Sequence, residues 1–190
     1  MSSIKVPQPV QIARVVLRTT AGAYPKMVRF YKTFLSASVS AQVSGLSFLT
    51  FDKEHHRIAI LSAPDTTPKD SQSCGLEHIS FTYENLDDLL QAYRGRKAMR
   101  LEPAWCVNHG PTLSIYYKDP DGNNLETQID TIKDMDEINA MITGDEFRQN
   151  PIGVDFDPEE LWKNMRSGVP YEELVTRRSI GPRGVDTVPL

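Results

Sequence analysis

The sequence lacks the features that mark secreted, membrane-spanning or nucleic-acid-binding proteins. Two cysteines in 190 residues are too few for a disulfide framework, and we expect Cys74 and Cys106 to be free thiols. No apolar run approaches the length of a membrane span, and the N-terminus lacks the apolar stretch of a signal peptide. Lys and Arg form no run, and the formal net charge is −4, which argues against a nucleic-acid-binding face. We therefore expect a cytoplasmic protein with neither a membrane nor a nucleic acid as its partner.

The first half of the chain predicts one strand, one helix and three further strands. Residues 11–18 are rich in β-branched residues, as strands are. A helical pattern follows, in which the apolar residues Met27, Phe30, Tyr31 and Phe34 are three or four positions apart. Strands are then expected at 37–44, 46–51 and 57–63. The stretch 64–75 is full of Asp, Thr, Ser and Pro, which is typical of a linker.

The same order of elements follows the linker. A strand is expected at 76–83, and Asn85 can cap a helix that places Leu86, Leu89, Leu90 and Tyr93 on one face. Three more strands are expected at 103–108, 112–118 and 124–130, with a tight turn over 119–123 between the last two. The sequence therefore predicts an α+β fold of two βαβββ modules within one domain, residues 10–130.

The C-terminal part, residues 131–190, has a different pattern. Helical patches at 134–142, 157–166 and 171–178 are separated by Gly and Pro. We expect a helical extension that packs on the sheet or on a second subunit, which would make the protein a homodimer.

All four histidines, His55, His56, His78 and His109, lie beside expected strands or turns of the two modules. A single histidine in such a place is most often a core or surface residue with no further role. Four of them together suggest a functional site.

Several segments carry a resemblance to a known family. They are residues 13–19 (ARVVLRT), 54–60 (EHHRIAI), 75–81 (GLEHISF), 119–126 (DPDGNNLE) and 150–158 (NPIGVDFDP). In this order and spacing they resemble the vicinal-oxygen-chelate superfamily of glyoxalases, bleomycin-resistance proteins and dihydroxybiphenyl dioxygenases. Within it, they are most similar to single-module relatives of the type I extradiol dioxygenases.

The resemblance implies a cupped mixed sheet, formed by the two modules, with the active site inside. In the family, iron is held by a His on the first strand, a His on the fifth and a Glu on the eighth, and open positions remain for a catecholate and dioxygen. The matching positions here are His78 on the fifth strand and Glu126 on the eighth. Arg14 occupies the first position, which departs from the family.

The resemblance also implies further site residues. His56 matches a histidine that acts on the substrate without binding metal, whereas its neighbour His55 is expected to face outward. Tyr116 matches a tyrosine that contacts substrate oxygens. His109 lies in a loop that reaches the site in relatives. Because side chains alternate along a strand, Arg14, Val16 and Arg18 should share one face, as should His78 with Ser80 and Glu126 with Gln128.

Arg14 changes the chemistry expected of the site. A guanidinium stays protonated and cannot bind a metal. At about 4 Å and an effective dielectric of about 20, its repulsion with a divalent ion is roughly 8 kcal/mol. We expect Arg14 instead to pair with Glu126, and no cofactor is favoured. In an alternative register Arg14 points outward, and His78, Glu126 and a third group such as His56 bind the metal.

Three functions follow from these expectations. The favoured one is a metal-independent enzyme that transfers protons on an oxygenated aromatic or polyketide-like small molecule of secondary metabolism, using His56, His78, His109 and Tyr116, with Arg14 and Glu126 binding the substrate. The second is a ring-cleaving extradiol dioxygenase that uses Fe²⁺ or another divalent metal. The third is a non-catalytic protein that binds a small molecule.

Overall fold

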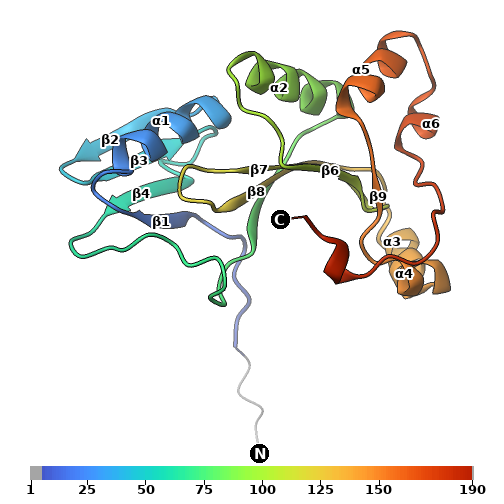
Figure 1. Ribbon diagram of the computed structural model, residues 1–190, viewed down its shortest axis with the longest axis horizontal. Helices are drawn as coiled ribbons and strands as arrows, with labels where there is room; N and C mark the ends of the chain where they lie inside the picture. The colour runs from blue at the N-terminus through green and yellow to red at the C-terminus, as the bar shows by residue number, and fades with distance from the viewer. Residues whose placement is uncertain (1–5, 190) are drawn as a thin grey trace, which may run out of the picture. The chain divides into compact units, whose positions relative to one another are not determined.

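The first compact unit of the chain is a βαβββ module. The computed structural model describes residues 6–189, and the chain divides into two units between Asp70 and Ser71 (Figure 1). The elements of the first unit are β1 (Val15–Thr19), α1 (Tyr24–Phe34), β2 (Ser38–Val43), β3 (Leu46–Thr50) and β4 (Ile58–Ser62). They form a mixed sheet of order β1-β4-β3-β2, in which only the β1–β4 pair is parallel. The element order predicted for this half is confirmed.

Helix α1 packs on one face of this sheet. Its buried side chains, Met27, Val28, Tyr31 and Phe34, recur at helical spacing along one side. At its start, the Tyr24 hydroxyl lies 2.6 Å from Ser47 Oγ of β3. Among the described residues of this unit, no helix covers the other face of the sheet.

Strand β1 is shorter than predicted, because it begins at Val15 rather than at residue 11. Ladder pairing with β4 starts at Val15 and Ile58. Ahead of it, the Arg57 side chain donates hydrogen bonds to the carbonyls of Ile12 and Ala13, which takes the place of a neighbouring strand. Arg14 thus lies one residue before the strand and not within it.

The second unit begins with another βαβββ module. It contains β5 (His78–Thr82), α2 (Leu86–Ala98), β6 (Trp105–Asn108), β7 (Thr112–Lys118) and β8 (Asn124–Asp130). The Asn85 side chain accepts a hydrogen bond from the Asp88 N–H, which confirms the predicted helix cap. In the 119–123 turn, Asp119 Oδ1 accepts from the backbone N–H groups of Asp121 and Asn123. Both predicted modules, and with them the α+β class, are therefore present.

The C-terminal extension is helical where the sequence predicts it, and it also contains one short strand that the sequence did not predict. It contains α3 (Met135–Thr143), α4 (Asp145–Gln149), β9 (Val154–Asp155), α5 (Pro158–Arg166), α6 (Tyr171–Val175) and a 3-10 turn, η1 (Val185–Thr187). Strand β9 pairs with β6 and makes the second sheet five-stranded, in the order β5-β8-β7-β6-β9. A two-residue strand leaves almost no periodic signal, which is why the sequence pattern did not reveal it.

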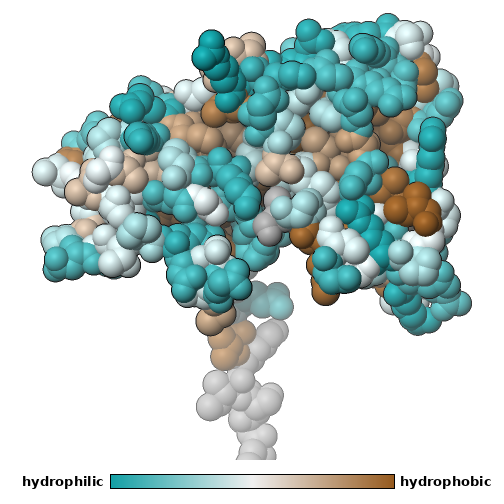
Figure 2. Space-filling model, viewed as in Figure 1, coloured by the Kyte–Doolittle hydropathy of each residue, from teal (hydrophilic) through white to brown (hydrophobic). Residues whose placement is uncertain are grey.

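Charged side chains attach the extension to α2 of the same unit. Arg166 Nη2 lies 2.6 Å from Asp87 Oδ1, and Lys97 Nζ lies 2.8 Å from Glu159 Oε1. The surface over α2 and α5 is accordingly mostly hydrophilic (Figure 2). The extension packs on its own chain here, whereas a homodimer and the domain boundaries at 130/131 stay predictions.

The two cysteines and the apolar content of the helices agree with the sequence prediction. Cys74 is exposed, Cys106 is buried, and both are free, as predicted. In the described part of the chain, no helix is long and apolar enough to cross a membrane. The expected lack of a signal peptide concerns the N-terminus, of which residues 1–5 lie outside the described residues, and the cytoplasmic location stays a prediction.

Candidate active site

Four of the six predicted site residues are in the second unit, on the face of its sheet that α2 leaves uncovered. In the strand register, Glu126 is paired with Tyr116 on one side and with Ser80 on the other, so these side chains share a face. Tyr117 points to the opposite face, where Arg96 of α2 lies 5.2 Å from its ring centre. His78, two residues before Ser80, is on the Tyr116 face.

A continuous series of polar contacts joins the four predicted site residues of this unit, which are His78, Glu126, Tyr116 and His109. His78 Nε2 lies 3.2 Å from Glu126 Oε2, and the Tyr116 hydroxyl donates to Glu126 Oε1 at 3.0 Å. His109 Nε2 lies 3.1 Å from the same hydroxyl, and its Nδ1 contacts the Ile152 carbonyl. The structure therefore brings together His78, Glu126, Tyr116 and His109, while their functional roles stay predictions.

Burial sets the charge of the inner part of this series. Tyr116 and Glu126 each expose only 4% of their surface. Burial, reinforced by the charge of Glu126, raises the pKa of Tyr116, which stays a neutral phenol at neutral pH. Burial also lowers the pKa of His109, which is therefore an uncharged imidazole under the same conditions.

The contacts in this series outnumber the protons available to make them. The Ile152 carbonyl can only accept, so Nδ1 of His109 carries the ring's proton and Nε2 is an acceptor. The Tyr116 hydroxyl has a single proton and can donate either to His109 or to Glu126. One contact is always left without a proton. The series can accept one proton from a ligand and gain a hydrogen bond by doing so.

Trp105 and the start of the C-terminal extension complete this face, and the sequence reasoning gave them no role. The Trp105 ring is stacked on Tyr116 with ring centres 5.1 Å apart, and its Nε1 donates to Asp155 at 2.8 Å. Ile152 packs with them in a buried cluster that Val188 also contacts. The segment 150–158 is one of those that carry the family resemblance, and that was the available signal.

The other two predicted site residues are in the first unit. Arg14 Nη1 lies 3.5 Å from His56 Nε2, and the His56 ring lies 4.7 Å from Phe48 of β3. His56 is buried and His55 is exposed, as expected. Burial, with smaller contributions from His55 and Arg14, lowers the pKa of His56. Arg14, Val16 and Arg18 are all exposed, which fits the predicted shared face. The expected pair between Arg14 and Glu126 joins residues of different units and stays a prediction.

The residues of the second unit do not supply a complete family metal site. His78 and Glu126 are close enough to bind one ion side by side. However, nowhere in residues 6–189 do three His, Cys, Asp or Glu side chains gather as a metal would require. The family's third position is Arg14, which has no lone pair to offer. The donor set therefore does not fit the 2-His-1-carboxylate iron of the family.

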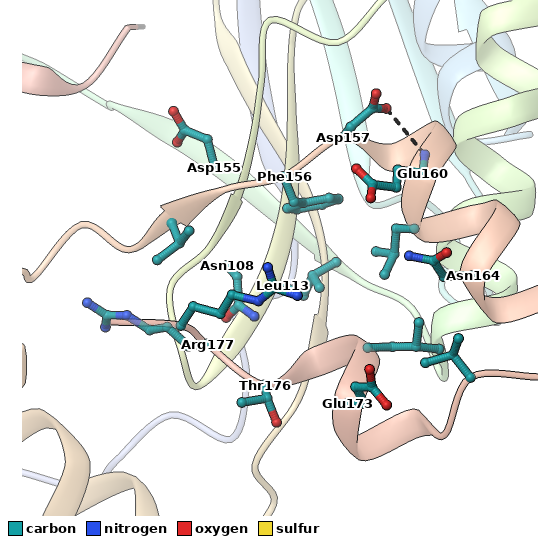
Figure 3. A pocket seen from close by; sticks show the side chains of 15 residues that line it. Asn108, Leu113, Asp155, Phe156, Asp157, Glu160, Asn164, Glu173, Thr176 and Arg177 are labelled. Atoms are coloured by element: carbon teal, nitrogen blue, oxygen red, sulfur yellow. Dashed lines mark hydrogen bonds between the residues drawn. The ribbon is translucent and has the colours of Figure 1, made fainter. Parts of the chain in front are cut away.

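A cavity of about 410 Å³ lies elsewhere in the second unit, between the extension and the sheet. Figure 3 shows Asn108 and Leu113 of the sheet on one side and residues of α5 and α6 on the other. Asn108 and Leu113 are paired in the register and belong to the face opposite Tyr116. None of the six predicted site residues lines this cavity.

Comparison with known proteins agrees with this architecture. The sequence model of the Glyoxalase/Bleomycin resistance protein/Dioxygenase superfamily matches residues 11–127, from ahead of β1 to the middle of β8. The chain belongs to this superfamily. The fold of the superfamily is thus confirmed from the sequence as well as from the two mixed sheets.

Two curated relatives of this superfamily member extend the match into the C-terminal extension. Biphenyl-2,3-diol 1,2-dioxygenase 2 of Rhodococcus globerulus is 40% identical over 167 residues, which cover 87% of each chain. Biphenyl-2,3-diol 1,2-dioxygenase 3 of the same organism is 37% identical over 172 residues, which cover 88% of each chain. Both names describe extradiol-type dioxygenases, so the similarity to this branch is confirmed.

Solved structures support the fold alone. A glyoxalase/bleomycin resistance protein/dioxygenase from Nocardioides aligns with a TM-score of 0.54 and 17% identity over 67% of this chain and 87% of its own. Lactoylglutathione lyase from Agrobacterium tumefaciens aligns with a TM-score of 0.53 and 15% identity over 65% of this chain and 96% of its own.

Proposed function

We propose that this superfamily member is a metal-independent enzyme that binds an oxygenated aromatic molecule as its phenolate or enolate and moves protons on it. One observation carries the proposal. Arg14 occupies the sequence position of the first family metal ligand, while the other two positions keep their residues, His78 and Glu126, 3.2 Å apart. A fixed cation at that position suits an anionic oxygen of the ligand and opposes a divalent ion.

The proton-accepting series supports the same proposal. Tyr116 is a neutral donor, and His109 is a neutral acceptor at Nε2. A phenol or enol can give up its proton to His78, whose Nε2 then donates to Glu126 whichever tautomer the free ring has. A ligand from solvent can reach His78, whose side chain is 37% exposed, whereas Tyr116 and Glu126 are buried. In this scheme His78 takes the ligand's proton.

His56 has the second acid–base role in the proposal. Its pKa is lowered, mainly by burial, so the ring is uncharged at neutral pH and can accept a proton. Its contact with Arg14 brings a base and a cation together in the first unit. A polyketide-like aromatic molecule, which carries several phenolic and enolic oxygens, is the ligand class that we propose.

A second candidate is ring cleavage by a dioxygenase, which the names of the two Rhodococcus relatives favour. Biphenyl-2,3-diol is therefore the first probe. The purified protein is mixed with this diol and air, once with added Fe²⁺ and once with EDTA. Under our proposal the diol binds equally in both samples, and neither sample yields the yellow ring-cleavage product. A yellow product that depends on Fe²⁺ would establish the dioxygenase and refute the metal-independent proposal.

A second experiment separates an enzyme from a binding protein. Hydroxyaryl ketones with exchangeable α-protons are incubated with the protein in D₂O, and mass spectrometry measures deuterium uptake. We expect uptake that EDTA leaves unchanged and that His78→Ala lowers by about 100-fold or more. His55→Ala, at an exposed position, is the matched control and should exchange like the wild type. Tight binding of the ketones with no exchange in any sample would show a non-catalytic binding protein.

A further inference from the structure

The loop that carries His109 is held by residues of the C-terminal extension. Asn108 Nδ2 donates to the Val175 carbonyl at 2.8 Å, and Arg177 Nη1 donates to the His109 carbonyl at 2.9 Å. Arg177 also donates, through Nη2, to the Asn150 carbonyl. Arg177 and Asn108 lie together in the wall of the 410 Å³ cavity (Figure 3). One guanidinium thus ties the His109 loop to the start of the 150–153 segment.

The 150–153 segment is folded so that its carbonyl at Ile152 faces His109. Asn150 is buried, and its Oδ1 accepts from the backbone N–H groups of Ile152 at 3.1 Å and Gly153 at 2.7 Å. Gly153 has a φ of 117°, and a Cβ there would collide with the Asn108 carbonyl. The segment therefore lies directly against the His109 loop, and its shape fixes where the Ile152 carbonyl points.

The next residue of the loop is also enclosed by the extension. Gly110 has a φ of 105°, and a Cβ there would collide with Met141 of α3 and crowd the Arg177 side chain. Main-chain atoms of 108–110 therefore contact the extension on one side, while the His109 ring reaches Tyr116 on the other. Each of these contacts with the extension comes from a residue after 140, outside the two βαβββ modules.

We propose that Arg177 is a positioning residue for His109. By binding the carbonyls of His109 and Asn150 together, it sets the distance between the His109 loop and the segment that ends in the Ile152 carbonyl. That carbonyl in turn keeps the ring proton on Nδ1 and presents the Nε2 lone pair to Tyr116. The C-terminal extension thereby orients a side chain of the site. The consequence for turnover rests on the proposed function, whereas the positioning itself does not.

The histidine ring nitrogens report this positioning without any ligand. In ¹⁵N NMR spectra, His109 of the wild type should give one protonated Nδ1 signal and one unprotonated Nε2 signal, assigned by their loss in His109→Gln. In Arg177→Ala we expect both signals to move toward the average of the two tautomers. Arg178→Ala, which removes the exposed neighbouring arginine, is the matched control and should leave both signals in place. Unchanged His109 signals in Arg177→Ala would overturn the proposal.

If Arg177→Ala does not fold, Arg177→Lys tests the positioning role of Arg177 instead. An ammonium keeps the charge but cannot span two carbonyls as the planar guanidinium does. The proposal predicts shifted His109 signals in this variant too, at an unchanged circular dichroism spectrum. A folded lysine variant with wild-type ring signals would contradict it.

Deuterium uptake by the hydroxyaryl ketones then separates this inference from the proposed function. A misplaced acid–base group lowers the rate more than it lowers binding, so kcat should fall by about 10- to 100-fold in Arg177→Ala while KM stays within about twofold. If the wild type shows no exchange, yet Arg177→Ala shifts the His109 signals, the positioning stands and the proposed function fails. If exchange is normal in Arg177→Ala and the His109 signals are unchanged, the positioning role is refuted and the proposed function stands.

Discussion

Replacing Tyr116 by phenylalanine should destabilise the protein by about 2 to 4 kcal/mol. The hydroxyl is the shared partner of Glu126 Oε1 at 3.0 Å and His109 Nε2 at 3.1 Å. Glu126 is only 4% exposed, so water cannot replace the lost donor. Removing the donor from one buried polar group costs about 1 to 3 kcal/mol, and more when the group is a carboxylate such as Glu126.

Urea unfolding measures this loss. With a slope of about 2 kcal/mol per molar urea, the midpoint should fall by about 1 to 2 M. Tyr171→Phe, at a residue that is 43% exposed, is the matched control and should change stability by less than about 0.5 kcal/mol. In the Tyr116→Phe background, Glu126→Gln should recover part of the loss, since it removes the buried charge. A wild-type midpoint for Tyr116→Phe would refute the series of contacts that the proposed chemistry uses.

Three further predictions follow from single side chains. Asn85→Ala removes the cap of α2 and should lower the free energy of unfolding, measured in urea, by about 1 kcal/mol. Asn85→Asp keeps the acceptor and should lower it much less. Equal losses in the two variants would contradict the capping role. A maleimide should label one thiol per native chain, the exposed Cys74, because Cys106 is buried and its pKa is raised to about 12; rapid labelling of both would show that Cys106 is accessible. Because burial lowers the pKa of His56 below its unfolded value of 6.5, the unfolded state binds protons more readily, and stability should fall as the pH drops from 7 to 5. His56→Gln should flatten that fall, and an unchanged slope would show that His56 does not contribute to it.

The element order of both modules was predictable because each element carries its own local signal. The apolar side of α1 and the cap at Asn85 are set by residues within three or four positions of one another, and both lie where the pattern indicates. The predicted start of β1 was less accurate. Ahead of Val15 the carbonyls of Ile12 and Ala13 accept hydrogen bonds from the Arg57 side chain instead of from a neighbouring strand. Such a contact between distant residues leaves no periodic signal.

The polar members of the site were predictable from the family motifs, whereas their surroundings were not. His78, Glu126 and Tyr116 follow from strand position and motif. Trp105, Arg177 and the fold of 150–153 depend on how the extension returns to the sheet, through the pairing of β9 with β6 and through the Asn150 side chain. No motif in the sequence states where a two-residue strand will pair, so the extension's role became visible only in the structure.

The iron content of Arg14→His tests most directly the proposal that Arg14 prevents metal binding. Iron is added anaerobically to the wild type and the variant, the proteins are desalted, and bound iron is counted per chain. Arg18→His, at another exposed arginine, four residues further along in β1, is the control. We expect trace iron in the wild type and in Arg18→His, and about one equivalent in Arg14→His, because a histidine there restores the residue type that the family resemblance implies for the first ligand of the 2-His-1-carboxylate set. Iron near one equivalent in the wild type, or no gain in Arg14→His, would contradict the proposal.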